Sequence, residues 1–229
     1  MARKLVRLTL DNLVDLPLSC QACAFWELDA VRRERATAAG ETASEKETWV
    51  SQVLLEWGSC GRVAYVDGEP AGYALYAPPL FLPGADAFPT APASEDAVLL
   101  ATAMVHPDYA GGGLGRMLMQ SVAKDLIKRG GIRAIEAFGD ARAARSEEPT
   151  YGGCVMPADF LLSVGFKTHR AHPRYPRMRL ELKSVVTWRE EVESALERLV
   201  GVVRPRPAAP APEHGRVVRD GRPAPGEGG

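Results

Sequence analysis

The residues best suited to chemistry form a glycine-rich turn between two apolar segments. Gly111, Gly112, Gly113 and Gly115 follow the apolar stretch 97–105 and precede a segment of helical periodicity. A turn from a buried strand into the first turn of a helix directs backbone N–H groups and the positive end of the helix dipole to one point. Such a turn suits a phosphate group, although the same glycines also fit a turn that merely lets strand and helix pack closely.

The residues after the turn exclude two common phosphate-binding loops. A P-loop requires Lys followed by Ser or Thr, whereas Arg116 and Met117 stand there. The dinucleotide-binding fingerprint beginning at Gly111 requires a glycine where Arg116 stands.

The cysteines form a second candidate group. Cys20 and Cys23 are spaced as C-x-x-C, and Cys60 and Cys154 would complete a four-thiolate zinc site. No second C-x-x-C accompanies the first, so we expect no metal. We expect reduced thiols, with Cys20 and Cys23 on one buried face of a helix.

Hydrophobic periodicity predicts the elements that position these groups. The expected strands are 3–8, 62–66, 71–76, 97–105, 132–138, 166–170 and 175–182, and the expected helices are 11–39 (broken near Pro17), 44–58, 113–129 and 158–164. The capping box Ser44-x-x-Glu47 is expected to open the second helix, and Asp67-Gly68 a tight hairpin turn. The fold class is α/β (α+β), a mixed, mostly antiparallel sheet covered by helices on both faces.

Three regions follow from composition. Residues 3–183 form the folded domain, 184–203 an amphipathic helix opened by Thr187-x-x-Glu190, and 204–229 a Pro- and Gly-rich tail expected to be disordered. The exposed stripe of the helix makes a homodimer plausible.

Around the glycine turn, the chain resembles the GNAT superfamily of N-acetyltransferases. Its motif A is a strand, then V-x-P, then Q/R-x-x-G-x-G/A opening a helix; this chain has Val105-His106-Pro107 and Ala110-Gly-Gly-Gly-Leu-Gly115. A second family marker, Gly-Phe after a short helix, is matched by Gly165-Phe166. Ala110 departs from the motif, because it replaces the usual Gln or Arg.

The resemblance implies that acetyl-CoA is the cosubstrate. Met104 and Val105 would pair with the pantetheine amides, and the turn would hold the pyrophosphate through Gly111, Gly112, Gly113, Leu114, Gly115 and Arg116. The acyl group would pass to a primary amine of a small molecule or a protein. The alternative is a non-catalytic acyl-CoA-binding sensor, which the departure at Ala110 favours slightly.

The catalytic residues are less evident. The family often has a Tyr as general acid where Leu161 stands, so Tyr151 and Cys154 are the candidate replacements. Glu136 is the candidate base, with a polar residue at a solvent-facing strand as its structural alternative. His106 is a possible proton relay, and Glu95, Asp96 and Asp140 are possible attractants for a cationic amine, although solvated loop charges explain them more simply. The loops 77–96 and 139–157 would frame the acceptor, with Trp26 as an apolar wall.

Charge and composition set the expected partners and location. Lys+Arg is 28 against Asp+Glu 29, giving a formal charge of -1, so nothing favours nucleic acid or an anionic membrane as partner. The N-terminus lacks the apolar stretch of a signal peptide or membrane span, so we expect a cytoplasmic protein.

Overall fold

The computed structural model describes residues 1–143 and 154–185. The chain divides into two compact units, Met1–Glu190 and Glu191–Gly229. The second unit lies outside the described residues, as do the predicted tail 204–229 and all but the first two residues of the helix predicted over 184–203.

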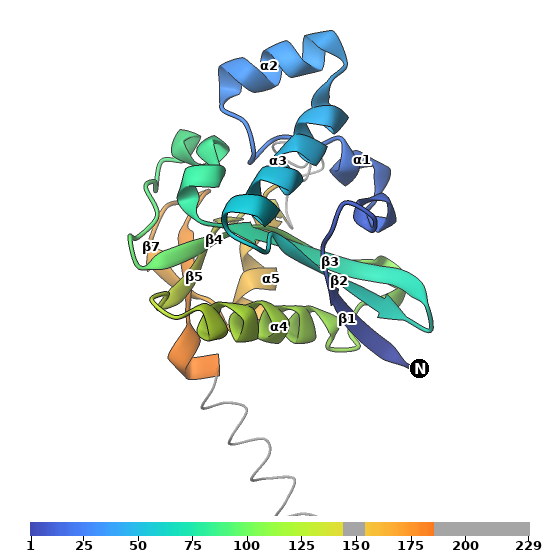
Figure 1. Ribbon diagram of the computed structural model, residues 1–229. Coiled ribbons are helices and arrows are strands. Elements are labelled where there is room, and N and C mark those ends of the chain that lie inside the picture. The colour runs from blue at the N-terminus through green and yellow to red at the C-terminus, as the bar shows by residue number, and fades with distance from the viewer. Residues whose placement is uncertain (144–153, 186–229) are drawn as a thin grey trace, which may run out of the picture. The chain divides into compact units, whose positions relative to one another are not determined.

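The strands form one mixed sheet in the order β1-β2-β3-β4-β5-β8-β7 (Figure 1). They are β1 (Arg3–Arg7), β2 (Gly61–Val66), β3 (Glu69–Ala77), β4 (Ala97–Val105), β5 (Ala134–Asp140), β7 (Lys167–Arg170) and β8 (Arg177–Glu181), and a short β6 (Met156–Pro157) pairs with the end of β5. Along this order, β4 and β5 run parallel and the other neighbours antiparallel. The predicted sheet class is confirmed, with some strand ends displaced by one or two residues.

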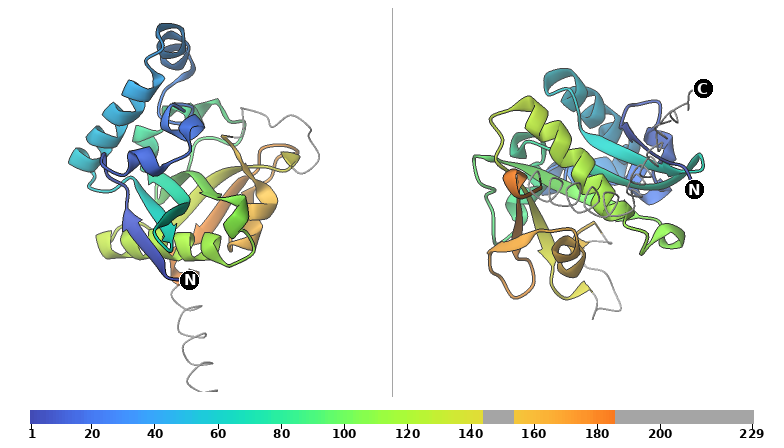
Figure 2. Two further views of the ribbon diagram at one scale, coloured as in Figure 1. Left: turned by 90° about the vertical axis from the view of Figure 1, so that its right-hand side faces the viewer. Right: turned by 90° about the horizontal axis from the view of Figure 1, so that it is seen from below.

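Helices cover both faces of this sheet (Figure 2). The helices are α1 (Leu18–Gln21), α2 (Ala30–Ala39), α3 (Thr42–Glu56), α4 (Leu114–Arg129) and α5 (Ala158–Ser163), of which α2 lies beyond α3, away from the sheet (Figure 1). Short 3-10 turns lie at η1 (Leu13–Asp15), η2 (Pro79–Phe81), η3 (Pro83–Ala87) and η4 (Pro107–Tyr109). The segment 77–96, predicted to be a loop, is thus ordered by two such turns.

Two local predictions concern turns. The hairpin between β2 and β3 is confirmed, because Asp67 and Gly68 adopt φ angles of 51° and 96°. The prediction that Ser44-x-x-Glu47 opens the helix was wrong. The helix α3 begins at Thr42, its N-cap is Glu41, and Ser44 lies inside the helix. Gly40 ends α2 in the left-handed region, so the chain enters α3 at once and its first turn forms before Ser44.

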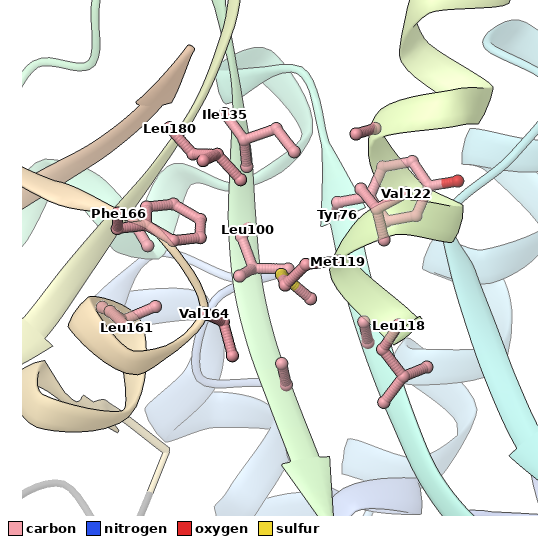
Figure 3. Close-up of a cluster of buried hydrophobic side chains, with 14 of the residues drawn as sticks. Tyr76, Leu100, Leu118, Met119, Val122, Ile135, Leu161, Val164, Phe166 and Leu180 are labelled. Atoms are coloured by element: carbon pink, nitrogen blue, oxygen red, sulfur yellow. The ribbon is translucent and has the colours of Figure 1, made fainter. Parts of the chain in front are cut away.

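Each face of the sheet has its own apolar cluster. On one face α4 and α5 pack through Leu118, Val122 and Leu161 against Leu100 and Ile135 (Figure 3). On the other face α3, η1 and the segment after α1 bury a second cluster, whose large members include Leu8, Leu13, Phe25, Trp26, Trp49, Leu75, Phe88 and Phe138. The sheet is therefore the shared wall between a layer containing α4 and a layer containing α1–α3.

A buried charge fixes α4 to the sheet. The Asp125 carboxylate pairs with Arg62 of β2 at 2.8 Å and with Arg129 at 3.2 Å, and accepts a hydrogen bond from the Tyr76 hydroxyl at 2.8 Å. Burial opposes ionisation, but the hydrogen bond from Tyr76 and the two cations hold the pKa of Asp125 below its usual value. The ionised carboxylate thus anchors the helix whose N-terminus follows the glycine turn.

We expect Asp125→Ala to lower the free energy of unfolding by about 3 kcal/mol, because it leaves Arg62 buried without its anionic partner. Urea denaturation measures this loss. Lys124→Ala, at an exposed position on the same helix, is the control and should change stability little. The pKa of Asp125 is lower in the folded than in the unfolded protein. The stabilisation by Asp125 is therefore present above the unfolded pKa of about 4, and it is lost as the pH falls through the folded pKa. Equal stability of the two variants would contradict the anchoring role.

Candidate active site

The site begins where two parallel strands part. β4 and β5 pair at Ala97–Ala134, Val98–Ile135 and Leu99–Glu136, and the ladder ends there. Beyond this point β4 stays paired with β3, but with a bulge: Leu75 faces Thr102 and Tyr76 faces Leu100, which leaves Ala101 as the extra residue. The second half of β4 therefore turns an open backbone edge toward the gap left by β5.

A cleft of about 500 Å³ occupies this gap. Its lining consists of the end of β4, the glycine turn, the start of α4, β6 and α5: Thr102, Ala103, Met104, Val105, Tyr109, Ala110, Gly111, Gly113, Leu114, Gly115, Arg116, Met156, Pro157, Phe160, Ser163 and Val164. The cleft thus combines an apolar floor with a strand edge and a helix N-terminus.

The glycine turn has the backbone geometry of an anion site. Gly111 and Gly113 adopt φ angles of 75° and 78°, and an added Cβ at either position would meet open space. The Met117 N–H donates to the Gly113 carbonyl at 3.1 Å, so the N–H groups before Met117 belong to the part of a helix that lacks intrahelical acceptors. Gly115 serves packing, because a Cβ there would lie 3.1 Å from the Phe160 ring.

Seven of the eight predicted cofactor-binding residues line the cleft. The exception is Gly112, whose carbonyl accepts a hydrogen bond from the Arg3 guanidinium at 2.8 Å. The Arg116 guanidinium lies 3.4 Å from the Ser163 carbonyl and so connects α4 to α5.

A second cavity, of about 130 Å³, lies on the α1–α3 side of the sheet. It shares Thr102 and Met104 with the cleft, and its other lining residues are Ser19, Cys20, Cys23, Trp26, Glu27, Lys46, Tyr73, Leu75 and Cys154. We call it the thiol cavity. A third cavity, of about 300 Å³, is lined in part by Asp15, Tyr73, Met104 and His106. All three cavities therefore share Met104.

Three of the four cysteines surround the thiol cavity. The Sγ atoms of Cys23 and Cys154 lie 3.1 Å apart, and the Tyr73 hydroxyl donates to the Sγ of Cys20 at 2.6 Å. Cys23 follows α1 rather than lying in it, so the two cysteines of the C-x-x-C pair do not share a helix face as expected. Cys60 is fully buried elsewhere in the α1–α3 layer.

The thiols have very different acidities. The hydrogen bond from Cys154 is the main reason that the pKa of Cys23 falls to about 6; burial and Glu27 oppose this, while Lys46 assists. The same hydrogen bond, with burial, raises the pKa of Cys154. Burial raises the pKa of Cys60 to about 12. Cys23 is thus the thiolate of the group, and Cys154 is its proton donor.

A buried ion pair closes the inner wall of the thiol cavity. Lys46 of α3 and Glu27 form a salt bridge in which both side chains are almost fully buried. Trp26 beside it stacks on Phe88, with ring centroids 5.1 Å apart, and its indole N–H donates to the Cys154 carbonyl at 3.0 Å. Trp26 and Cys154 thus line the cavity, whereas the segment 77–96 contacts it only through Phe88 behind Trp26.

Glu136 lies outside the lining of all three cavities. It is fully buried, so the alternative of a solvent-facing residue was wrong. Ser94 donates through its backbone N–H at 3.0 Å and its hydroxyl at 2.6 Å, and the guanidinium groups of Arg177 and Arg179 lie 3.4 and 3.0 Å away. Although burial raises it, these donors and cations leave the pKa of Glu136 below its usual value.

The remaining candidates are dispersed. Tyr151 lies outside the described residues, and Leu161 is fully buried in the α4 layer. Asp96 forms ion pairs with Arg179 and Arg133, which accounts for its charge without an amine. Asp140 is buried and accepts from the Arg142 N–H at 2.8 Å, whereas Glu95 is exposed. The His106 ring lines the third cavity and accepts weakly, at 3.4 Å, from the Asp108 N–H.

Sequence reasoning missed Tyr73, Thr102, Glu27 and Lys46 as members of the site. Thr102 was visible as the polar residue inside the most apolar strand. The other three carry no local signal, because their place depends on contacts between α3, β3 and the segment after α1. Among the described residues, no group of three or more His, Cys, Asp or Glu side chains is arranged to hold a metal ion.

The fold and cleft define a class of protein. It is an α/β protein whose open mixed sheet has two parallel strands that separate, with a glycine turn suited to phosphate at the end of one of them. The model of the Acetyltransferase (GNAT) family matches residues 25–146, more than half of the chain. The chain therefore belongs to the GNAT acetyltransferase family, and the resemblance seen in its motifs is confirmed. No curated protein matches the sequence.

Solved structures share the fold at low sequence identity. The aminoglycoside acetyltransferase AAC(6')-Ib, in complex with coenzyme A and kanamycin, is 16% identical, with 82% of this chain and 99% of that chain covered and a TM-score of 0.52. An N-acetyltransferase from Staphylococcus aureus Mu50 is 16% identical (80% and 99% covered, TM-score 0.49). The PaiA N-acetyltransferase from Thermoplasma acidophilum, in complex with coenzyme A, is 12% identical (79% and 99% covered, TM-score 0.47).

The acidity of Cys23 gives a prediction. Because the thiolate is the nucleophile, we expect the rate of Cys23 alkylation by iodoacetamide to be half-maximal near pH 6. Cys60 in the same sample is the internal control and should stay unlabelled in the folded protein. Peptide mass spectrometry over a pH series measures both rates. A half-maximum near pH 8.5, the value of an ordinary thiol, would contradict the hydrogen bond from Cys154 to Cys23.

Proposed function

We propose that the protein is an N-acetyltransferase that moves an acetyl group from acetyl-CoA to a primary amine of a small molecule or a protein. The observation that carries the proposal is the open edge of β4 leading directly to a glycine turn at the N-terminus of α4. An extended amide chain ending in a pyrophosphate suits this combination. Family membership supports the same reading.

Each part of the cosubstrate has a suitable partner. The edge of β4 at Met104 and Val105 offers backbone groups to the pantetheine amides, in the manner of an added strand. The N–H groups between Gly111 and Arg116 offer donors to the pyrophosphate, and each such bond to an anionic oxygen contributes roughly 1.5–3 kcal/mol. Ala110 lacks the polar side chain of the Gln or Arg that is usual in the motif. The backbone N–H groups are therefore the main contributors to pyrophosphate binding.

The thioester would then lie near Met104 and Thr102, where cleft and thiol cavity meet. The acceptor amine attacks the carbonyl carbon directly in a ternary complex. A C–N bond forms, the C–S bond breaks, coenzyme A leaves with the electron pair of that bond, and the amine loses a proton. Holding both reactants in this geometry supplies up to about 7–11 kcal/mol.

Deprotonation of the amine is the more demanding requirement. An amine of pKa about 10.4 costs roughly 4.6 kcal/mol to deprotonate at pH 7, whereas release of a thiolate of pKa about 8.5 costs roughly 2 kcal/mol. The acidic Glu136, held by two arginines away from the cavities, is poorly placed as a base. We assign it a positioning role, in which it ties β5 to β8 at the point where β4 departs.

Cys154 remains a candidate acid, because its thiol is protonated at neutral pH and faces a cavity that adjoins the cleft. Tyr151, three residues earlier, stays a prediction of the sequence, as do the cytoplasmic location and the homodimer. Within residues 1–143 and 154–185, every helix is too short or too polar to span a membrane.

The second candidate function is a non-catalytic acyl-CoA sensor. The full burial of Leu161 favours it, because the position usual for the acid points into the core. Saturable binding without turnover on any amine would identify this function.

We expect acetyl-CoA to bind saturably in isothermal titration and Gly113→Glu to abolish binding. The new carboxylate would repel the pyrophosphate, and a non-glycine residue would be strained at the φ of 78° that the turn requires. Gly131→Glu is the matched control: Gly131 has a similar φ of 73° and equally open surroundings, but follows the other end of α4. Binding retained in Gly113→Glu, or lost in both variants, would contradict the proposed phosphate site.

We expect Cys154→Ala to reduce kcat for acetyl transfer by about 100-fold, the lower range for loss of an acid or base, and to leave acetyl-CoA affinity unchanged. The probes are a panel of spermidine, kanamycin and a lysine peptide, with the acetylated product detected by mass spectrometry. Cys60→Ala, which alters a fully buried thiol that lines none of the three cavities, is the control. Unchanged turnover in Cys154→Ala would remove this residue from the mechanism.

A further inference from the structure

The contact between Cys23 and Cys154 is not required by acetyl transfer as proposed above. Their sulfurs lie 3.1 Å apart although the residues are separated by 131 positions in the chain. A disulfide needs an S–S separation of about 2.05 Å, so closure requires an approach of only about 1 Å. Both residues are half-buried and line the thiol cavity, which a molecule of peroxide size can enter.

Packed neighbours hold the two thiols close to each other. The indole N–H of Trp26 donates to the backbone carbonyl of Cys154, and its ring stacks on Phe88 and Phe138 with centroids 5.1 and 6.3 Å away. Trp26 follows Cys23 by three residues, so one side chain fixes the backbone on both sides of the thiol pair. The short contact is thus held by the packing of the α1–α3 layer.

The other two cysteines lack a second sulfur in contact with their own. Cys20 lines the same cavity, but its Sγ accepts a hydrogen bond from the Tyr73 hydroxyl at 2.6 Å. Cys60 is fully buried with a raised pKa. The charges facing Cys23 are those of Glu27 and Lys46, which largely balance each other as a buried pair. Cys23 and Cys154 are therefore the one pair of thiols placed to form a disulfide.

We propose that Cys23 and Cys154 form a reversible disulfide in response to peroxides, and that this bond consumes the Cys154 thiol beside the proposed acetyl-transfer point. The Cys23 thiolate attacks a peroxide oxygen, so that an S–O bond forms and the O–O bond breaks. The Cys154 thiol then attacks this sulfenic sulfur, forming the S–S bond and releasing the oxygen as water. In sum, two thiols lose two electrons and two protons, and one hydrogen peroxide becomes two waters.

The consequence for activity rests on the proposed function. The disulfide joins two residues of the thiol cavity wall but none of the cleft lining. Oxidation therefore removes the thiol of Cys154, the candidate acid, and spares acyl-CoA binding.

The test uses the full chain, reduced and then exposed to equimolar hydrogen peroxide. After blocking of remaining thiols under denaturing conditions, we expect two of the four cysteines to be protected and a non-reduced digest to contain the Cys23–Cys154 cross-linked peptide. Dithiothreitol should restore all four thiols. Cys23→Ser and Cys154→Ser should each prevent the cross-link, whereas Cys60→Ala should not. A different pairing, or sulfinic acid at Cys23 without a cross-link, would overturn the proposal even if the serine variants failed to fold.

Titration with acetyl-CoA separates this proposal from the proposed function. We expect the oxidised protein to bind acetyl-CoA as the reduced one does while its turnover falls to background and returns with dithiothreitol. Loss of binding on oxidation, or full turnover in the cross-linked protein, would contradict the removal of the Cys154 acid as the effect of the disulfide. Absence of binding in both forms would count against the acetyltransferase, whereas the peptide map would still decide the disulfide.

Discussion

The ladder between β4 and β5 ends at Leu99, and the backbone of β4 beyond that point turns an open edge toward the cleft. Backbone N–H and C=O groups are costly to bury without partners, so an open strand edge inside a folded domain persists where water or a ligand can satisfy it. The cleft exists because the two strands part, and its floor is the apolar layer of α4 and α5. The anchoring of α4 by Asp125 keeps the glycine turn at the end of this edge.

The strand, glycine turn and helix of the proposed cofactor site were predictable from the sequence because their signals are local. An apolar strand, a run of glycines and a helical stripe follow one another within about thirty residues, and positive φ angles at Gly111 and Gly113 explain why glycine is needed there. The sheet class followed similarly from alternation and the Asp67-Gly68 turn. The start of α3 did not, because the tight exit from α2 at Gly40 outweighed the Ser44 capping pattern.

The residues around the thiol cavity were not predictable as a group, because they meet through tertiary contacts. Cys154 contacts Cys23 although the two are 131 positions apart in the chain, and Lys46 of α3 pairs with Glu27 in the segment after α1. Strand alternation could not distinguish a solvent-facing Glu136 from one buried among arginines, since its partners Ser94, Arg177 and Arg179 come from other segments. One sequence carries no information on such pairings.

The bulge at Ala101 determines which side chains of β4 serve each face. Leu99 and Ala101 pack in the α1–α3 layer, and Ala103 packs in the α4 layer. If all residues of β4 alternated without a bulge, Ala103 would lie on the face of Leu99 and Thr102 on the opposite face. Deletion of Ala101 would instead join Leu100 to Thr102 and make the pairing with β3 regular, so Thr102 and Ala103 would keep their faces. Loss of this one residue would thus change the bend and twist of β4 beside the cleft rather than the side chains that each layer receives.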